Sequence, residues 1–173
     1  DVYKRQPYDS YSGKVFAGSV SVYDRGSSSV RYCTAGTSAS GCRAFVTACG
    51  TPSATLASGF VLAAQDVEGS ANGLFFFGSS GRQANPWGNG TSFQCVAPPV
   101  HRAGTLIGEG ASGSCEGSFS QDLNARWCPG CPKAHHNPGV GATVQAQLWY
   151  RDPQSSSNQT TALSDAVEFT MLP

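Results

Sequence analysis

The chain has 173 residues, enough for one domain with a substantial hydrophobic core, and it contains no apolar run of membrane-spanning length. Charged residues make up only 13% and the formal net charge is 0, without a block of one sign. A nucleic-acid-binding surface is disfavoured because it needs a clustered cationic field. The 21 glycines and 10 prolines favour short strands and turns over helices. We therefore expect an all-β fold, an antiparallel β-sandwich or jelly roll of about nine to eleven short strands, with long Gly/Pro-rich loops and little or no helix.

The first six residues are expected to be foreign to the protein. Residues 1–6 read Asp-Val-Tyr-Lys-Arg-Gln, which is the translation of the transposon end used in sequencing-library preparation. We interpret them as an assembly scar and exclude them from the fold. The chain is then expected to be the tail of a longer protein, with the upstream domains of that protein as partners.

Residues 7–31 predict a hairpin or linker. Val20 and Val22 alternate with small polar residues, as in a strand, and a Ser-rich turn follows. Pro7-Tyr8 and the Gly-Ser-Val-Ser-Val-Tyr run at 18–23 resemble the last strands of an FG-GAP β-propeller blade. The resemblance implies the end of an FG-GAP repeat, although the segment has no Asp-x-Asp-x-Asp-Gly calcium loop. A plain hairpin is the alternative.

Three consecutive phenylalanines mark the centre of the fold. Residues 74–77 form a continuous apolar run between two glycines, which predicts a strand buried on both faces. The glycine-rich residues 78–90 predict a long loop that carries an aromatic side chain, and residues 92–96 predict the next strand. The side chains on one face of the first strand are expected to be nearly fully buried, either Phe75 and Phe77 or Phe76 with Leu74.

The clearest strand pattern covers residues 143–151. Its alternation puts two sets of residues on opposite faces, Val144, Ala146, Leu148 and Tyr150 on one and Gln145, Gln147, Trp149 and Arg151 on the other. Leu148 is expected to be buried. Shorter strands are predicted at residues 43–47, 60–64, 105–107 and 166–172.

Most of residues 32–173 resemble a known module. The residues that carry the resemblance are 32–37, 50–53, 73–78, 81–90, 124–129, 145–153 and 169–170. They are similar to an uncharacterised C-terminal β domain at the ends of large exported bacterial proteins, often behind FG-GAP or other β-repeat regions. The resemblance implies a secreted, non-catalytic module, and it supplies no ligand or active site. Cys49 does not match its pattern.

Seven cysteines in a β chain indicate an oxidising, extracellular compartment. The preferred pairing joins cysteines that are close in sequence, namely Cys33–Cys42, Cys95–Cys115 and Cys128–Cys131, and it leaves Cys49 unpaired. Sequence spacing leaves this connectivity open. In the chain-entropy model, a bridge that closes a loop of about 10 to 20 residues contributes roughly 3 kcal/mol.

The Trp-Cys-Pro-Gly-Cys run at 127–131 has two readings. It resembles the thioredoxin motif, but a redox pair needs its first cysteine at a helix N-terminus, and proline follows the second cysteine here. We therefore expect a static disulfide and no metal. The alternative is a zinc site, because thiolates and imidazoles are the preferred zinc ligands; its candidate ligands are Cys128, Cys131, His135 and His136.

The best binding candidate is the loop around Trp87. Loop aromatics stack on sugar rings, and neighbouring amides and guanidiniums hydrogen-bond hydroxyl groups, so the predicted binding set is Arg82, Asn85, Trp87 and Asn89. The expected partner is a polysaccharide or cell-surface polymer. The alternative is that Trp87 folds back to cover a sheet end.

No residue is assigned a catalytic role, and no cofactor is expected. The chain contains no Gly-x-Ser-x-Gly elbow, and His101 is interpreted as an exposed loop histidine. We expect a non-catalytic extracellular accessory module at the C-terminus of a larger secreted bacterial protein, serving adhesion, polymer binding or capping of a repeat array. The alternatives are a carbohydrate-binding module centred on Trp87, and a structural zinc or catalytic domain centred on residues 128–136.

Overall fold

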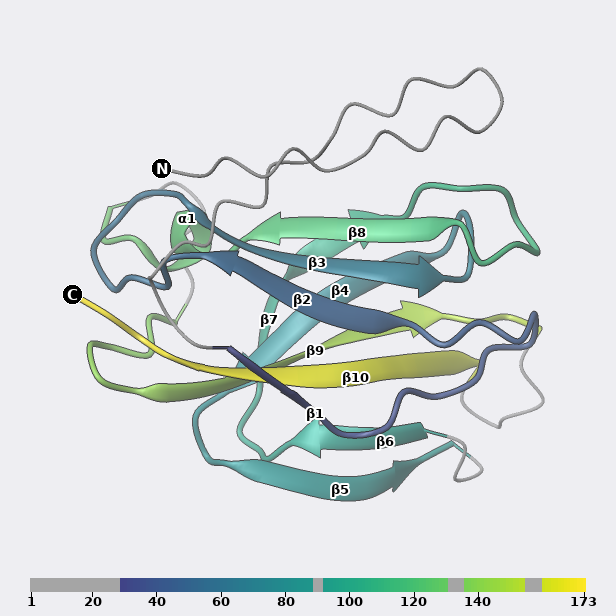
Figure 1. The fold of residues 1–173 in the computed structure, drawn as a ribbon, viewed down its shortest axis with the longest axis horizontal. Helices are drawn as coiled ribbons and strands as arrows, with labels where there is room; N and C mark the ends of the chain where they lie inside the picture. The colour runs from purple at the N-terminus through teal and green to yellow at the C-terminus, as the bar shows by residue number, and fades with distance from the viewer. Residues whose placement is uncertain (1–28, 89–91, 131–135, 155–159) are drawn as a thin grey trace, which may run out of the picture.

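The computed structural model of the protein describes residues 29–88, 92–130, 136–154 and 160–173 (Figure 1). Strands make up 52% of this part and helix 3%, and the named strands all pair antiparallel. These findings confirm the expected all-β sandwich. The expected scar at 1–6 and the segment 7–28 lie outside the described residues. Within the described ranges, no helix has the length and apolarity needed to span a bilayer.

Two sheets face each other, and a hairpin packs on the outside of the larger sheet (Figure 1). In spatial order, the larger sheet contains β1 (Val30–Tyr32), β10 (Thr161–Thr170), β9 (Thr143–Arg151), β4 (Asn72–Gly78) and β7 (His101–Ile107). The smaller sheet contains β2 (Phe45–Gly50), β3 (Phe60–Val67) and β8 (Gly117–Asp122). The hairpin consists of β5 (Arg82–Trp87) and β6 (Ser92–Val96).

The boundaries of two elements differ from the expectations. β1 begins at Val30, before the module boundary expected at residue 32, and pairs with β10. Residues 78–90 were expected to form a loop, but they contain β5. The six residues of β5 are Arg-Gln-Ala-Asn-Pro-Trp, which have no apolar alternation, so the strand is held by its pairing with β6 and not by a buried face of its own.

β4 is buried on both faces, as its apolar run predicts. Phe75 and Phe77 are 0% and 1% exposed and belong to the core between the sheets, together with the equally buried Leu148 of β9. Phe76 points the other way and is 6% exposed, because it packs against Val96 of the hairpin. Replacing Phe75 or Phe77 with alanine is expected to cost about 3–5 kcal/mol of folding free energy.

The short helix α1 (Asn124–Trp127) closes one end of the core. Its Trp127 is 1% exposed, and its ring centroid lies 5.2 Å from that of Phe77, 6.3 Å from that of Phe60 and 6.1 Å from that of Phe169. These three rings come from both sheets. Trp127 therefore fixes the two sheets against each other at this end.

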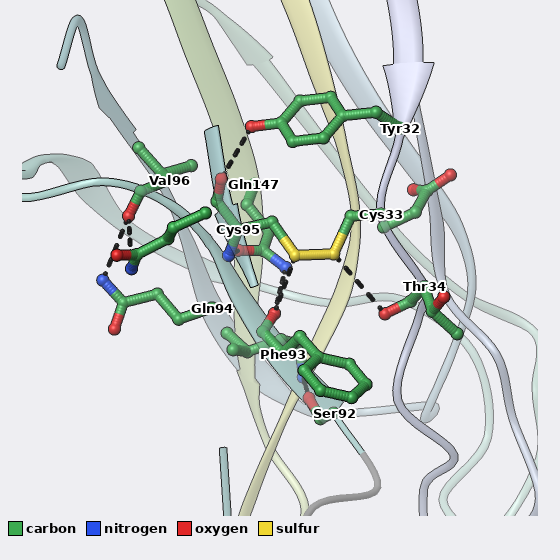
Figure 2. Close-up of a disulfide and its surroundings, with 12 residues drawn as sticks. Tyr32, Cys33, Thr34, Ser92, Phe93, Gln94, Cys95, Val96 and Gln147 are labelled. Carbon is green, nitrogen blue, oxygen red and sulfur yellow. Dashed lines mark hydrogen bonds between the residues drawn. A yellow bond between two sulfur atoms is a disulfide. The ribbon is translucent and has the colours of Figure 1, made fainter. Parts of the chain in front are cut away.

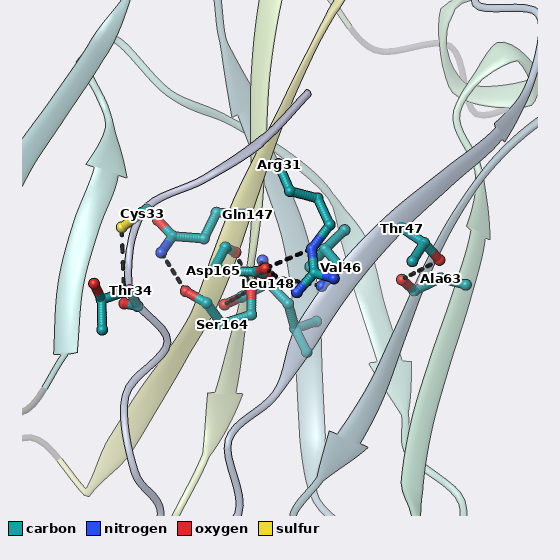
Figure 3. A network of polar contacts seen from close by, with 10 residues as sticks. All are labelled: Arg31, Cys33, Thr34, Val46, Thr47, Ala63, Gln147, Leu148, Ser164 and Asp165. Atoms are coloured by element: carbon teal, nitrogen blue, oxygen red, sulfur yellow. Dashed lines mark hydrogen bonds and ion pairs between the residues drawn. The ribbon is translucent and has the colours of Figure 1, made fainter. Parts of the chain in front are cut away.

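Asp165 connects the two sheets at a bulge in β10 (Figure 3). Its Oδ1 accepts the backbone N–H of Val46 in β2 at 2.6 Å, and its Oδ2 accepts two hydrogen bonds from Arg31 of β1 at 2.9 and 2.6 Å. Burial raises the pKa of the Asp165 carboxyl, while the contacts from Arg31 and Val46 lower it. The bulge thus aims a charged group at the neighbouring sheet, where two donors meet it.

Two disulfides join described cysteines, Cys33–Cys95 and Cys42–Cys115, with Cα–Cα distances of 6.2 and 5.2 Å. The local pairing of Cys33 with Cys42 and of Cys95 with Cys115 is therefore wrong. The physical reason is that an antiparallel sandwich brings together segments distant in sequence, here separated by 62 and 73 residues. Cys49 is a free, exposed cysteine, as the odd count predicts.

Candidate functional site

A groove of about 460 Å³ lies on the outer face of the larger sheet, beside the β5–β6 hairpin. Its volume falls within the range of about 300–1,000 Å³ that is typical of small-molecule sites. We call it the Trp87–Trp149 groove. The described residues that line it are Asn72, Gly73, Leu74, Phe76, Trp87, Gln94, Val100, Arg102, Thr105, Trp149, Arg151 and Leu163.

The groove exists because the hairpin covers only part of the outer face. Gln147 of β9 accepts the N–H of Cys95 at 3.0 Å and donates to the carbonyl of Phe93 at 2.8 Å (Figure 2). Gln145 accepts the N–H of Gly81 at 3.1 Å. These amides hold the hairpin over one half of β9. The other half of the same strand face remains open and forms the groove.

The Cys33–Cys95 disulfide also fixes the hairpin in place. Cys95 lies on β6, and Cys33 directly follows β1 at the edge of the larger sheet (Figure 2). The hydroxyl of Tyr32 donates to the carbonyl of Cys95 at 2.9 Å. The hairpin is therefore anchored both covalently and through polar contacts, so the wall of the groove is preorganised.

The floor of the groove is apolar. Phe76 and Leu163 are buried, and Leu74, Trp87 and Trp149 pack against them while remaining partly exposed. Trp149 stands opposite Leu74 in the pairing of β9 with β4, and opposite Leu163 in the pairing of β9 with β10. Trp149 is thus supported from both sides, and part of its surface faces the groove.

Trp87 forms a wall on the hairpin side. Its indole Nε1–H donates to Thr161 Oγ1 at 3.1 Å, which fixes the orientation of the ring. The side chain is half-buried and still lines the groove. The sequence offered two alternatives for Trp87, a ligand-binding aromatic or a side chain that covers the sheet. The structure combines them, since Trp87 packs against the sheet and also lines the groove.

The rim of the groove is polar and carries positive charge. Arg102, Thr105, Asn72 and Arg151 are exposed, and Gln94 is partly exposed. Among its described lining residues there is no aspartate, glutamate, histidine, cysteine or serine. The groove can thus offer aromatic surface, amide and hydroxyl groups and two guanidiniums to a ligand.

Of the three predicted binding residues that the structure describes, only Trp87 lines the groove. Arg82 forms an ion pair with Glu168 at 2.6 Å and lies over the Tyr32 ring, 4.5 Å from its centroid. The hydrogen bond from Arg82 is the largest influence on Glu168 and lowers the pKa of that carboxyl. Asn85 is an exposed residue of β5 outside the groove lining. Asn89 lies outside the described residues.

Three groove residues were not predicted from the sequence, namely Trp149, Arg102 and Arg151. A signal for Trp149 was present, because the alternation of residues 143–151 puts a tryptophan on the face opposite the apolar residues. A large aromatic side chain on the outer face of a sheet is either covered by another element or available to bind a ligand. Arg102 had no comparable signal, since its place in the groove depends on the pairing of β7 with β4.

The Cys128–His136 region is only partly described. Cys128 is disulfide-bonded and follows the C-terminal end of α1, so it lies at the wrong end of a helix for a stabilised thiolate. Cys131 and His135 lie outside the described residues, and with them the expected Cys128–Cys131 bridge and half of the alternative zinc ligands. His136 is exposed. Among the described residues, no group of three or more potential metal ligands comes together.

His101 begins β7, which corrects its interpretation as a loop histidine. Its ring stacks on that of His136, with centroids 4.0 Å apart and an interplanar angle of 9°, and lies 5.7 Å from the Phe77 ring. Burial and, to a lesser degree, the neighbouring His136 lower the pKa of His101. The two histidines do not belong to the groove, because its described lining includes neither of them.

Comparisons with protein-family models, with curated proteins and with solved structures found no match to this chain.

Proposed function

We propose that this domain is a non-catalytic carbohydrate-binding module that holds a saccharide chain in the Trp87–Trp149 groove. The observation that carries the proposal is the pair of partly exposed tryptophans in one preformed hollow, with amide and hydroxyl side chains at its rim. This proposal takes up the carbohydrate-binding module that the sequence offered as an alternative. Trp87 is kept, and the other binding residues are now those of the groove.

Saccharide rings suit this combination of groups. A pyranose has an apolar face of C–H groups and an edge of hydroxyls, so it binds where an aromatic surface lies next to hydrogen-bonding side chains. The faces of Trp87 and Trp149 supply the aromatic surface, and Asn72, Gln94 and Thr105 supply donors and acceptors.

The lining favours binding over hydrolysis. A glycosidase of the usual kind needs two carboxyl groups that flank the scissile bond, one to protonate the leaving oxygen and one to assist the attack at the anomeric carbon. The described lining of the groove offers neither an aspartate nor a glutamate. Arginine, amide and tryptophan side chains bind and orient a saccharide but do not exchange protons with it at neutral pH.

An extracellular location supports the same proposal. Two disulfides between described residues are the pattern of exported proteins, because cytosolic reductants keep thiols reduced. In this account the domain is the C-terminal accessory module of a larger secreted bacterial protein, as the sequence resemblance implies. Its role is to attach that protein to a polysaccharide or cell-surface polymer.

Affinity gel electrophoresis against a panel of soluble polysaccharides tests the proposal. We expect the wild-type protein to be retarded by at least one polymer. Trp149→Ala should weaken that binding about tenfold to a hundredfold, because the loss of a buried aromatic contact costs about 1.5–3 kcal/mol. Trp149→Phe should keep most of the affinity, since it retains an aromatic face.

Phe93→Ala is the matched control, because Phe93 is a half-buried aromatic of β6 outside the groove lining. Circular dichroism should show that each variant is folded. The proposal is wrong if no polymer in the panel retards the wild-type protein, or if Trp149→Ala and Phe93→Ala bind as well as each other.

A further inference from the structure

Two arginines of the groove have no hydrogen-bond acceptor or ion-pair partner among the described residues. The structure describes six arginines, and four of them direct their side chains at protein acceptors, namely Arg31 at Asp165, Arg82 at Glu168, Arg43 at Thr37 and Arg126 at Gln121. Arg102 and Arg151 form no hydrogen bond or ion pair with a described residue. They are also the two arginines that line the Trp87–Trp149 groove.

The charge of the groove is unbalanced. Its described lining has two guanidiniums and no carboxylate, in a chain with a formal net charge of 0. Arg151 also borders a second hollow beside Glu68, whose carboxylate accepts hydrogen bonds from the hydroxyl of Ser40 and from the N–H of Gly113. The positive charge at the groove is therefore available to a ligand.

Strand pairing puts the two arginines at opposite corners of the groove. Arg102 of β7 stands opposite Phe76 of β4, whereas Arg151 ends β9, two residues beyond Trp149. Standard strand geometry separates their Cα atoms by about 13 Å along the strands and about 10 Å across two strand spacings. The row that contains Leu74 and Trp149 lies between them. A ligand that crosses the aromatic floor diagonally would meet a cation near each end.

Arg151 is also coupled to the aromatic surface. Its guanidinium carbon lies 5.4 Å from the centroid of the Trp149 ring. A ring that packs on Trp149 would exclude water from this guanidinium, and an ion pair formed there would gain strength because the local dielectric falls. Stacking and charge recognition therefore support each other at this position.

We propose that the groove selects an acidic polysaccharide, whose carboxylate or sulfate groups bind Arg102 and Arg151. This inference rests on the proposed carbohydrate binding and adds the chemical class of the ligand. A nucleic acid is the less favoured polyanion, because two arginines neutralise few phosphates and the chain as a whole carries no cationic excess.

Pairs of polymers that differ only in charge provide the test. The first pair is polygalacturonate and its fully methyl-esterified form, and the second is dextran sulfate and dextran. We expect the wild-type protein to bind the charged member of at least one pair about tenfold more tightly, since charge-assisted hydrogen bonds are markedly stronger than neutral ones. The preference should shrink between about 20 mM and about 500 mM NaCl, because salt screens exposed charges.

Arg102→Gln/Arg151→Gln should reduce binding of the charged polymer to the level of the neutral one, so that the preference is lost. Arg43→Gln is the control, because it removes one positive charge from an exposed arginine outside the groove. It should bind as the wild-type protein does.

The outcomes separate the two proposals. Equal binding of both members of each pair, or a preference that survives in the double variant, overturns the acidic ligand and leaves saccharide binding in place. If neither member of any pair nor any panel polysaccharide binds, both proposals are wrong. Tighter binding of single-stranded oligo(dT) than of the best acidic polymer, lost in the double variant, would assign the groove to nucleic acid instead.

Discussion

Asp165 shows how a single buried carboxyl shapes the contact between the sheets. Its side chain is only 8% exposed, and a charge at such a position is tolerated because three N–H groups meet its two oxygens. Burial raises the pKa of Asp165, and Arg31 is the strongest influence that lowers it. Arg31 therefore stabilises the folded state to the extent that Asp165 is ionised.

Arg31→Met should destabilise the protein by about 1–2 kcal/mol at neutral pH, a value below that of a fully buried pair because 53% of the Arg31 side chain is exposed. Arg31 lowers the folded-state pKa of Asp165, so its contribution is present above that pKa and is lost as the pH falls through it. We expect little difference between the two proteins near about pH 3, where Asp165 is mostly protonated in both. Urea unfolding at the two pH values measures both differences.

Arg43→Met serves as the control, since Arg43 hydrogen-bonds only the hydroxyl of Thr37 and is exposed. A loss of stability in Arg31→Met that is equally large at acidic and neutral pH would contradict the ionic role of Arg31.

The β5–β6 hairpin is the element on which the groove depends. It is held by Gln145 and Gln147 from below and by the Cys33–Cys95 disulfide from the side. A two-stranded hairpin has little stability by itself in water. Its position against the larger sheet therefore relies on these anchors and on the small apolar cluster around Phe76.

Removal of the Cys33–Cys95 disulfide in Cys33→Ala/Cys95→Ala should release the hairpin. The bridge spans 62 residues, which in the chain-entropy model corresponds to about 4 kcal/mol of stabilisation. Cys42→Ala/Cys115→Ala removes a bridge of similar span, 73 residues, that does not touch the hairpin. We expect comparable losses in urea unfolding, with faster amide hydrogen exchange in β5 and β6 only for the first variant. Equal exchange in both variants would show that the disulfide does not anchor the hairpin.

Periodicity in the sequence predicted the elements whose own residues determine them. The bounds of β6 and β9 agree with the predicted 92–96 and 143–151, and the phenylalanines of β4 are buried as expected. β5 was missed because its stability comes from β6 and the sheet beneath it, which no local pattern encodes. The disulfide pairs were missed for the same reason, since pairing follows the topology of the sandwich.

At the scale of the whole molecule, the sandwich gives each sheet face a different role. The inner faces share one core, closed at one end by Trp127, and the outer face of the larger sheet is divided between the hairpin and the groove. Trp87 was a binding candidate from the sequence alone, because it lies in a Gly- and Asn-rich segment. The second half of the site could not be foreseen, because Trp149 and Arg102 meet Trp87 only after three separate strands pair.

In the proposed binding mode, Trp87 and Trp149 together bind a saccharide in one groove. The chain has three tryptophans, and the third, Trp127, is buried in the core, so it is an internal reference. We would titrate the ¹⁵N-labelled protein with short oligosaccharide fragments of the panel polysaccharide that binds it most tightly, and follow the three indole Nε1–H signals by NMR. The account predicts that the signals of Trp87 and Trp149 shift together along one binding curve while that of Trp127 stays in place. If the oligosaccharide leaves the Trp87 and Trp149 signals unchanged at saturating concentration, the account is contradicted.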